Sequence, residues 1–159
     1  MKTVKDCMST KVVSVKRSTP LNGVIQLFKD HNFHTLPVVE GNNRLVGVIT
    51  LEEILSVFQP HSSDLERMLK TIPFLEPSRE EDLLLTDISS EIGVLVVADD
   101  VMTHKFVTIN PTASIGEAYS SMRLHQVDIL MVTEQERLIG VITKFDIILS
   151  LFKEQGVIE

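Results

Sequence analysis

The chain has 159 residues, of which 43% are hydrophobic and 23% charged, so it can bury a packed core and lacks the composition of a disordered protein. Its formal net charge of −7 argues against binding to nucleic acid or to an anionic membrane, and no apolar run is long enough to span a bilayer. Cys7 is the only cysteine, which excludes an intramolecular disulfide and a cysteine-based zinc site and favours a reducing, cytoplasmic setting.

The first predicted elements form a strand-helix-strand-strand-helix unit. Val12–Val15 is apolar and β-branched and predicts a short strand. Thr19-Pro20 supplies a cap and a first-turn proline for a helix. The apolar residues of that helix share one face: Leu21, Val24, Ile25 and Phe28. Two strands, Thr35–Val39 and Leu45–Ile49, flank a Gly-Asn-Asn turn that indicates a hairpin, and a second helix is predicted to begin after Thr50.

Residues 59–98 are predicted to form a structured insert rather than a flexible linker, because they contain two apolar elements and few glycines. Ser63 and Glu66 have capping-box spacing. The apolar residues that follow trace one face of a helix: Leu65, Met68, Leu69 and Ile72. Ile92–Ala98 is predicted to be a strand. We expect the insert to pack on the rest of the chain, and added packing is favoured over a dedicated binding role.

The second half of the chain repeats the first. Ser114 and Glu117 have capping-box spacing at the start of a helix. The apolar face of that helix comprises Ile115, Ala118, Tyr119 and Met122. Strands are predicted at Ile129–Thr133 and Leu138–Ile142, and another helix begins after Thr143.

Direct matches between the two halves establish the repeat. Arg44–Thr50 and Arg137–Thr143 differ at one position only, and Met8–Val15 aligns with Met102–Ile109. A fixed internal repeat of this kind indicates two copies of one supersecondary unit. The chain is therefore predicted to divide into residues 1–58, an insert at 59–98, and residues 99–159.

Three motifs occur in the same order in both halves. They are a Met-Ser-Thr or Met-Thr-His start, a Leu-Pro-Val-Val strand that is clearest at Leu36–Val39, and Gly-Val-Ile-Thr-x-x-acid at Gly47–Glu53 and Gly140–Asp146. With these motifs the chain resembles the CBS-domain family, named after cystathionine β-synthase. The resemblance implies an α/β (α+β) fold in which two β-α-β-β-α domains pack through their sheets with pseudo-two-fold symmetry.

The resemblance also implies a function. The clefts of such pairs usually hold adenosine compounds such as AMP, ADP, ATP or S-adenosylmethionine, and the pairs commonly form homodimers through their helices. We therefore expect a regulatory module that senses such a ligand, needs no cofactor, and acts on an effector protein that the sequence does not identify.

The main ligand site is predicted at Thr143 and Asp146. A strand ends and a helix begins at Thr143, and a helix N-terminus favours anions. The Thr143 hydroxyl could bind a phosphate or cap the helix, and the Asp146 carboxylate could accept two ribose hydroxyls or complete a capping box. The resemblance favours the ligand roles, and Lys144 adds positive charge. It also implies an apolar slot for the base, lined by Phe106, Val107, Ile129 and Leu130.

A second site in the first half is predicted to be weak or empty. It would use Thr50 and Glu53, but Glu53 stands where the family has Asp, and its longer side chain either passes the ribose or caps the helix. The residues of its apolar slot would be Val12, Val13, Leu36 and Pro37.

No catalytic residue and no metal site are predicted. The sequence has no Gly-x-Gly-x-x-Gly, Gly-x-x-x-x-Gly-Lys-Ser/Thr or Gly-x-Ser-x-Gly motif, and its histidines lack metal-ligand spacing. The alternative to a ligand sensor is a ligand-free dimerisation or protein-interaction module with vestigial clefts, and Glu53 favours that alternative.

Overall fold

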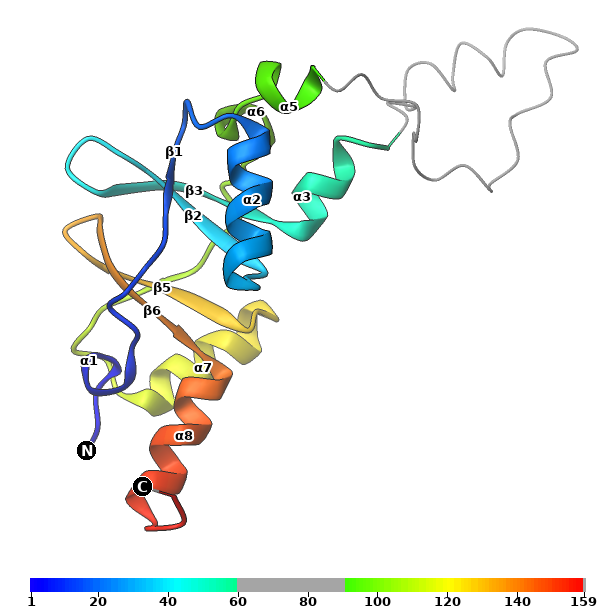
Figure 1. The fold of residues 1–159 in the computed structure, drawn as a ribbon. Coiled ribbons are helices and arrows are strands. Elements are labelled where there is room, and N and C mark those ends of the chain that lie inside the picture. The colour runs from blue at the N-terminus through cyan, green and yellow to red at the C-terminus, as the bar shows by residue number, and fades with distance from the viewer. Residues whose placement is uncertain (60–90, 159) are drawn as a thin grey trace, which may run out of the picture.

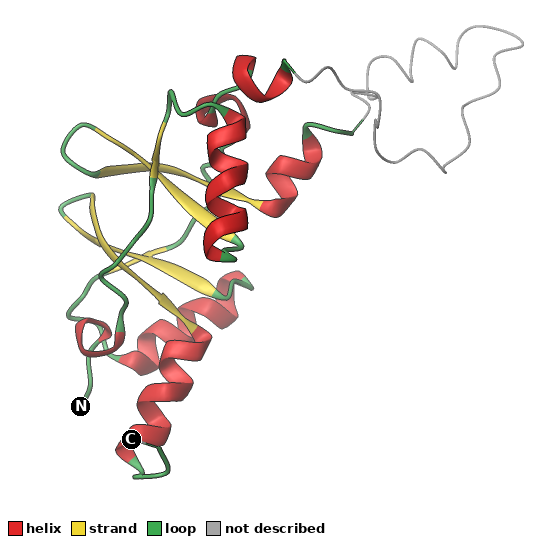
Figure 2. Cartoon of the chain, in the orientation of Figure 1, coloured by secondary structure: helices red, strands yellow, loops and turns green. Residues whose placement is uncertain are grey.

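The computed structural model describes residues 1–59 and 91–158, which form two α/β repeats that meet in one six-stranded mixed sheet (Figure 1). The strand order is β1-β2-β3-β6-β5-β4, so the strands of the two repeats follow each other in mirrored order across the sheet. This mirrored order is the one that the predicted pseudo-two-fold arrangement requires. The long helices lie on one side of the strands (Figure 2).

The first repeat contains a parallel strand pair, β1 with β2, and an antiparallel hairpin, β2 with β3. Its elements are β1 (Val15–Lys16), α2 (Leu21–His31), β2 (Thr35–Glu40), β3 (Arg44–Thr50) and α3 (Leu51–Ser56). The second repeat has the same pairings, and its elements are β4 (Thr108–Ile109), α7 (Ile115–His125), β5 (Ile129–Glu134), β6 (Arg137–Thr143) and α8 (Lys144–Glu154). Each hairpin contains one shift of register, at matching positions in β2 and β5.

The start of each repeat differs in part from its prediction. The strand predicted at Val12–Val15 is reduced to β1, because only its last residue pairs with β2. Pro20 rather than Thr19 occupies the N-cap of α2, and the Thr19 hydroxyl instead accepts a hydrogen bond from the Lys16 N–H at 3.0 Å. In α7 the predicted cap is confirmed, because Ser114 Oγ accepts from the Glu117 N–H at 3.1 Å.

The strand predicted at Ile92–Ala98 is wrong. The segment forms two short helices, α5 (Ile92–Leu95) and α6 (Ala98–Val101), with extended residues between them. α5 packs on α2, with Gly93 close to Asn22, and the bridge between Val97 and Pro20 is an isolated one that extends into no strand. A run of apolar residues cannot form a stable strand without a partner strand.

Each repeat is completed by the segment that leads into the other repeat. The first lead-in, residues 3–9, contains α1 (Val4–Cys7); its Val4 belongs to the core of the second repeat, and its Met8 packs against that core. The second lead-in, residues 97–103, contains α6, and its Ala98 and Val101 belong to the core of the first. Backbone hydrogen bonds fix both segments, from the Val4 N–H to Ala113 at 2.8 Å and from the Ala98 N–H to Thr19 at 2.8 Å.

Two glycines make this exchange possible. Ser9 exchanges backbone hydrogen bonds with Val141 at 2.9 and 3.0 Å, and Thr103 does the same with Val48 at 2.8 and 3.0 Å. The lead-ins therefore cross directly over Gly140 and Gly47. A Cβ on Gly140 would lie 2.9 Å from the Ser9 carbonyl oxygen, and one on Gly47 would lie 3.1 Å from that of Thr103. These distances are too short for a comfortable contact, so the motif Gly-Val-Ile-Thr needs its glycine for packing.

The hairpins of the two repeats meet in a separate apolar cluster and at their tips. The cluster combines buried residues of both repeats, namely Val39, Leu45, Val48, Met131 and Leu138. At the tips, the Leu45 N–H donates to Glu136 O at 3.0 Å and the Leu138 N–H donates to Asn43 O at 2.9 Å. The two repeats are thus held together at both the tips and the middle of their hairpins.

Two further predictions concern the insert helix and membrane-spanning segments. The predicted insert helix around residues 65–72 lies outside the described residues. Within residues 1–59 and 91–158, no helix has the length and apolar character needed to cross a membrane.

We predict that Gly140→Ala lowers the free energy of unfolding by about 1–3 kcal/mol, the usual cost of overpacking a core, because the Ser9 backbone cannot move away without losing its hydrogen bonds to Val141. Urea unfolding measures the effect. Gly116→Ala is the matched control, because Gly116 lies in α7 and a Cβ added there would meet the Ser114 hydroxyl oxygen only at 3.8 Å. Alanine at this position should stabilise the protein by up to about 1 kcal/mol. Equal effects of the two substitutions would refute the packing argument.

We also predict a loss of stability at acid pH that depends on Glu117. Hydrogen bonds from the Ser114 N–H at 2.7 Å and hydroxyl at 2.9 Å lower the pKa of the Glu117 carboxyl. A lowered pKa in the folded state stabilises the protein above the ordinary pKa of glutamate, and the benefit disappears as the pH falls through the folded value. Urea unfolding over a pH series should therefore show wild type more stable than Glu117→Gln near pH 7, with the difference shrinking below pH 4.5. A constant difference would contradict this.

Candidate functional site

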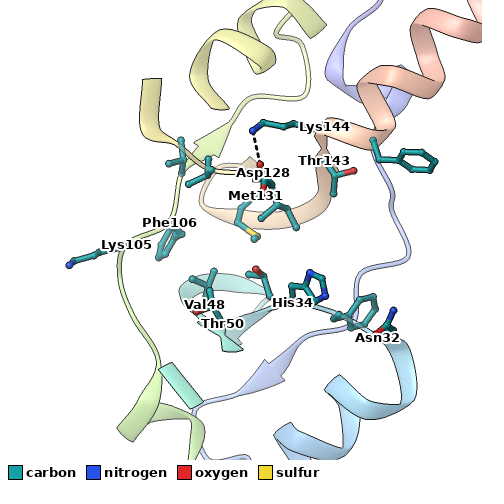
Figure 3. A pocket seen from close by; sticks show the side chains of 16 residues that line it. Asn32, His34, Val48, Thr50, Lys105, Phe106, Asp128, Met131, Thr143 and Lys144 are labelled. Carbon is teal, nitrogen blue, oxygen red and sulfur yellow. Dashed lines mark hydrogen bonds and ion pairs between the residues drawn. The ribbon is translucent and has the colours of Figure 1, made fainter. Parts of the chain in front are cut away.

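A pocket of 580 Å³ opens between the two hairpins, where β3 and β6 end and their following helices begin (Figure 3). Both repeats contribute to it. The lining residues from the first repeat are Asn32, Phe33, His34, Thr35, Val48 and Thr50. The second repeat contributes its residues before β4, before β5 and at the start of α8. The pocket is therefore a property of the pair and could not form on one repeat alone.

Thr143 lies at the junction between β6 and α8 and is fixed by a reciprocal capping box. Its hydroxyl accepts from the Asp146 N–H at 3.2 Å, while its own N–H and hydroxyl both donate to Asp146 Oδ2 at 2.7 Å. The interpretation of Thr143 and Asp146 as a capping box is thus correct. The Asp146 Oδ1 atom has no hydrogen bond within the described part of the chain, so the capping box leaves one carboxylate oxygen unused.

Thr50 occupies the matching junction between β3 and α3. Its N–H donates to Glu53 Oε2 at 2.9 Å, and its hydroxyl donates to the same oxygen. Glu53 therefore acts as a helix cap, which is one of the two outcomes that its extra length allows. The two junctions present equivalent threonines to one pocket.

The charges around the pocket are few. Lys144 Nζ forms an ion pair with Asp128 Oδ1 at 2.6 Å, and the side chain of Asp128 is 85% exposed and that of Lys144 43%. Lys105 is exposed and has no ion pair within residues 1–59 and 91–158. With His34 counted as neutral, Lys105 is therefore the lining charge left unbalanced, and the rim of the pocket is slightly positive although the whole chain is acidic.

The pocket brings together most of the residues predicted for the main site. Its lining includes Phe106, Val107, Ile129, Thr143 and Lys144. Leu130 is instead fully buried in the core of the second repeat. Asp146 lines a separate hollow of 250 Å³, which Lys2, Asp6 and Cys7 also line. A contact between Asp146 and a ribose therefore stays a prediction.

The residues predicted for the second site do not gather in this pocket, with the exception of Thr50. Val12 packs against the apolar cluster between the two hairpins, and Val13 packs against the core of the first repeat. Leu36 is fully buried, and Pro37 is buried in β2. Their part in a second ligand site stays a prediction.

Several lining residues of this pocket were not predicted, among them all those of the first repeat except Thr50. The missed lining residues of the second repeat are Lys105, Val127, Asp128, Met131 and Phe145. A usable signal was present, since Phe33–Thr35 and Val127–Ile129 hold matching positions just before their hairpins. Figure 3 shows Phe106, Asp128 and Thr143 on one side of the pocket, facing His34, Val48 and Thr50.

Comparisons with known proteins agree with this architecture. The sequence model of the CBS domain matches residues 4–60 and 97–153. An uncharacterised protein of Methanocaldococcus jannaschii, MJ1426, is 28% identical over 93% of this chain and 90% of its own length. The crystal structure of AcuB from Vibrio cholerae superposes with a TM-score of 0.72 at 22% identity, covering 100% of this chain and 98% of that one. CBSX2, a CBS-pair protein of Arabidopsis thaliana, was solved in complex with AMP and superposes with a TM-score of 0.71 at 20% identity, covering 98% and 99% of the two chains.

Proposed function

The chain belongs to the CBS-domain family, and on that premise we propose that it is a regulatory module that binds an adenine nucleotide or a related adenosyl compound in the pocket between its repeats. The ligand would be AMP, ADP, ATP or S-adenosylmethionine. Occupation of the pocket would change the relative position of the repeats or the assembly of the protein. An effector protein would read that change.

The pocket shared by both repeats is the observation that carries this proposal. Its volume of 580 Å³ lies within the usual range of small-molecule sites, roughly 300–1,000 Å³. It combines apolar and aromatic side chains with a few hydroxyl and amine groups, as a site for a base attached to a phosphorylated sugar requires. A protein of the same fold, CBSX2, was crystallised with AMP.

We assign separate parts of the ligand to separate groups of residues. Phe106 would stack on the base, with Val107 and Ile129 completing the apolar surface. The start of α8 would receive a phosphate, the Thr143 hydroxyl would turn its proton from Asp146 Oδ2 to a phosphate oxygen, and Lys105 would supply positive charge. A ligand that extends past Thr143 would offer a ribose hydroxyl to the free Oδ1 of Asp146, a residue that lines the neighbouring hollow.

The module would work as a homodimer without catalysis, in the cytoplasm. The helices carry exposed apolar side chains that suit such an interface, namely Ile25, Leu55, Tyr119, Ile148, Leu151 and Phe152. The same surface favours the alternative function, a ligand-free dimerisation or interaction module. Under that alternative the pocket would be vestigial.

We predict that AMP binds the wild-type protein and that Thr143→Val weakens the binding about tenfold or more. Losing a hydrogen bond to a charged group costs about 1.5–3 kcal/mol, and each 1.4 kcal/mol is tenfold in affinity. Phe106→Val should have a similar effect, because base stacking is worth about 1–3 kcal/mol and valine is what the first repeat has at the matching position, Val12. Isothermal titration calorimetry measures each affinity.

Ser114→Ala is the control, since it also removes a helix cap but lies outside the pocket. It should lower stability by about 1 kcal/mol without changing the affinity for AMP. If neither AMP nor the other adenosyl compounds bind the wild type, the ligand-sensor proposal fails and the interaction module replaces it. Unchanged binding in both pocket variants would mean that the ligand sits elsewhere.

We predict that Ile148→Glu converts a homodimer to monomers, because a charge on this exposed apolar face of α8 would have to be buried in the interface. Sedimentation velocity measures the oligomeric state. Lys11→Glu is the control, because Lys11 is exposed and belongs to no helix. A monomeric wild type, or equal effects of both substitutions, would rule out a dimer through the helices.

A further inference from the structure

The tips of the two hairpins place two arginines side by side. β3 and β6 are joined through one antiparallel register pair, and that pair is Arg44 with Arg137. Residues directly opposite each other in such a pair have their Cβ atoms about 4.5–5.5 Å apart, and like charges there are destabilising. Both repeats therefore contribute the same cation to one point on the pseudo-two-fold axis.

The neighbouring acids leave these arginines largely uncompensated. Glu40 lies opposite Arg44 in the first hairpin. Its Oε2 atom contacts Arg17 Nε at 2.8 Å, while its Oε1 atom is 4.0 Å from Arg44 Nη1. Glu134 lies opposite Arg137 in the second hairpin, yet Arg137 forms no ion pair with any described residue. Across the four central strands the charges thus run acid, base, base, acid, with the two bases adjacent.

The arginines also line a hollow of 390 Å³ that is rich in hydrogen-bond donors. Gly41, Asn42 and Gln135 line it beside them, and Glu40 is its one acidic lining residue. The tips are held in place by the backbone bonds between Leu45 and Glu136 and between Leu138 and Asn43, so the backbone positions of the two arginines are fixed before any ligand arrives. A fixed backbone lowers the conformational entropy that is lost on binding, although the arginine side chains still have to be ordered.

We propose that Arg44 and Arg137 form an anion site that takes a phosphate group, separate from the pocket at Thr143. A phosphate carries a charge of about −1.5 to −2 near pH 7, which matches two guanidinium groups, and its oxygens fit their planar donor forks. Arg44 begins β3 and Thr50 ends it, so the two sites lie about 20 Å apart along the strand. A phosphate bound to both arginines would tie the two repeats together at their tips.

Calorimetric titration with inorganic phosphate at low ionic strength tests the site, with glycerol 3-phosphate in a second arm. We expect both to bind the wild type, and we expect Arg44→Gln and Arg137→Gln each to weaken the binding tenfold or more. Binding of inorganic phosphate alone would assign the site to the free ion, while binding of both would assign it to phosphorylated metabolites. Arg123→Gln is the matched control, because Arg123 is exposed on α7 and has no ion pair with any described residue.

A second measurement separates this site from a loss of folding. In phosphate-free buffer, Arg44→Gln and Arg137→Gln should unfold at the same or a higher urea concentration than the wild type, because each removes a like-charge contact. Phosphate should then raise the unfolding midpoint of the wild type and of Thr143→Val but not of the two arginine variants. Full phosphate binding by the arginine variants, no binding by the wild type, or loss of binding in Thr143→Val alone would each overturn the proposal.

Discussion

The close crossing of each lead-in over a glycine of the other repeat is the contact on which the rest of the structure depends. Met8 and Ser9 lie against Gly140, and Met102 and Thr103 lie against Gly47. Because the lead-ins also carry buried residues into the opposite cores, neither repeat has a complete core without the other. The relative position of the two hairpins follows from these crossings, and so does the space left between their ends.

That space becomes an asymmetric pocket because matching positions hold different side chains. The two junction threonines are equivalent, but Phe106 of the second repeat replaces Val12 of the first, and Asp128 replaces His34. A symmetric backbone therefore presents an asymmetric set of side chains. The pocket is lined by Phe106 and Val107 and not by the matching Val12 and Val13. The two repeats therefore differ in more than Glu53, which stands in the first repeat where the second has Asp146.

Sequence reasoning could predict the features that depend on local pattern. The two hairpins follow from the apolar strand residues and the turn residues between them. The cap of α7 at Ser114 follows from the capping-box spacing to Glu117. The failures depend on tertiary neighbours. Ile92–Ala98 has a strand-like composition, but α2 is its nearest partner. Spacing cannot reveal which side chains from distant segments converge, so neither the first-repeat residues that line the pocket beside Thr50 nor the separate hollow that Asp146 lines with Cys7 could be predicted.

The exchanged lead-ins also suggest how such a molecule could arise. Two copies of a half-length chain that swap their N-terminal arms would form a symmetric dimer with the same two crossings. Joining the two genes end to end converts that dimer into one polypeptide and frees each half to mutate independently. The divergence of Phe106 from Val12 and of Asp128 from His34 is then the expected outcome of duplication followed by specialisation, with the crossing glycines as the positions least free to change.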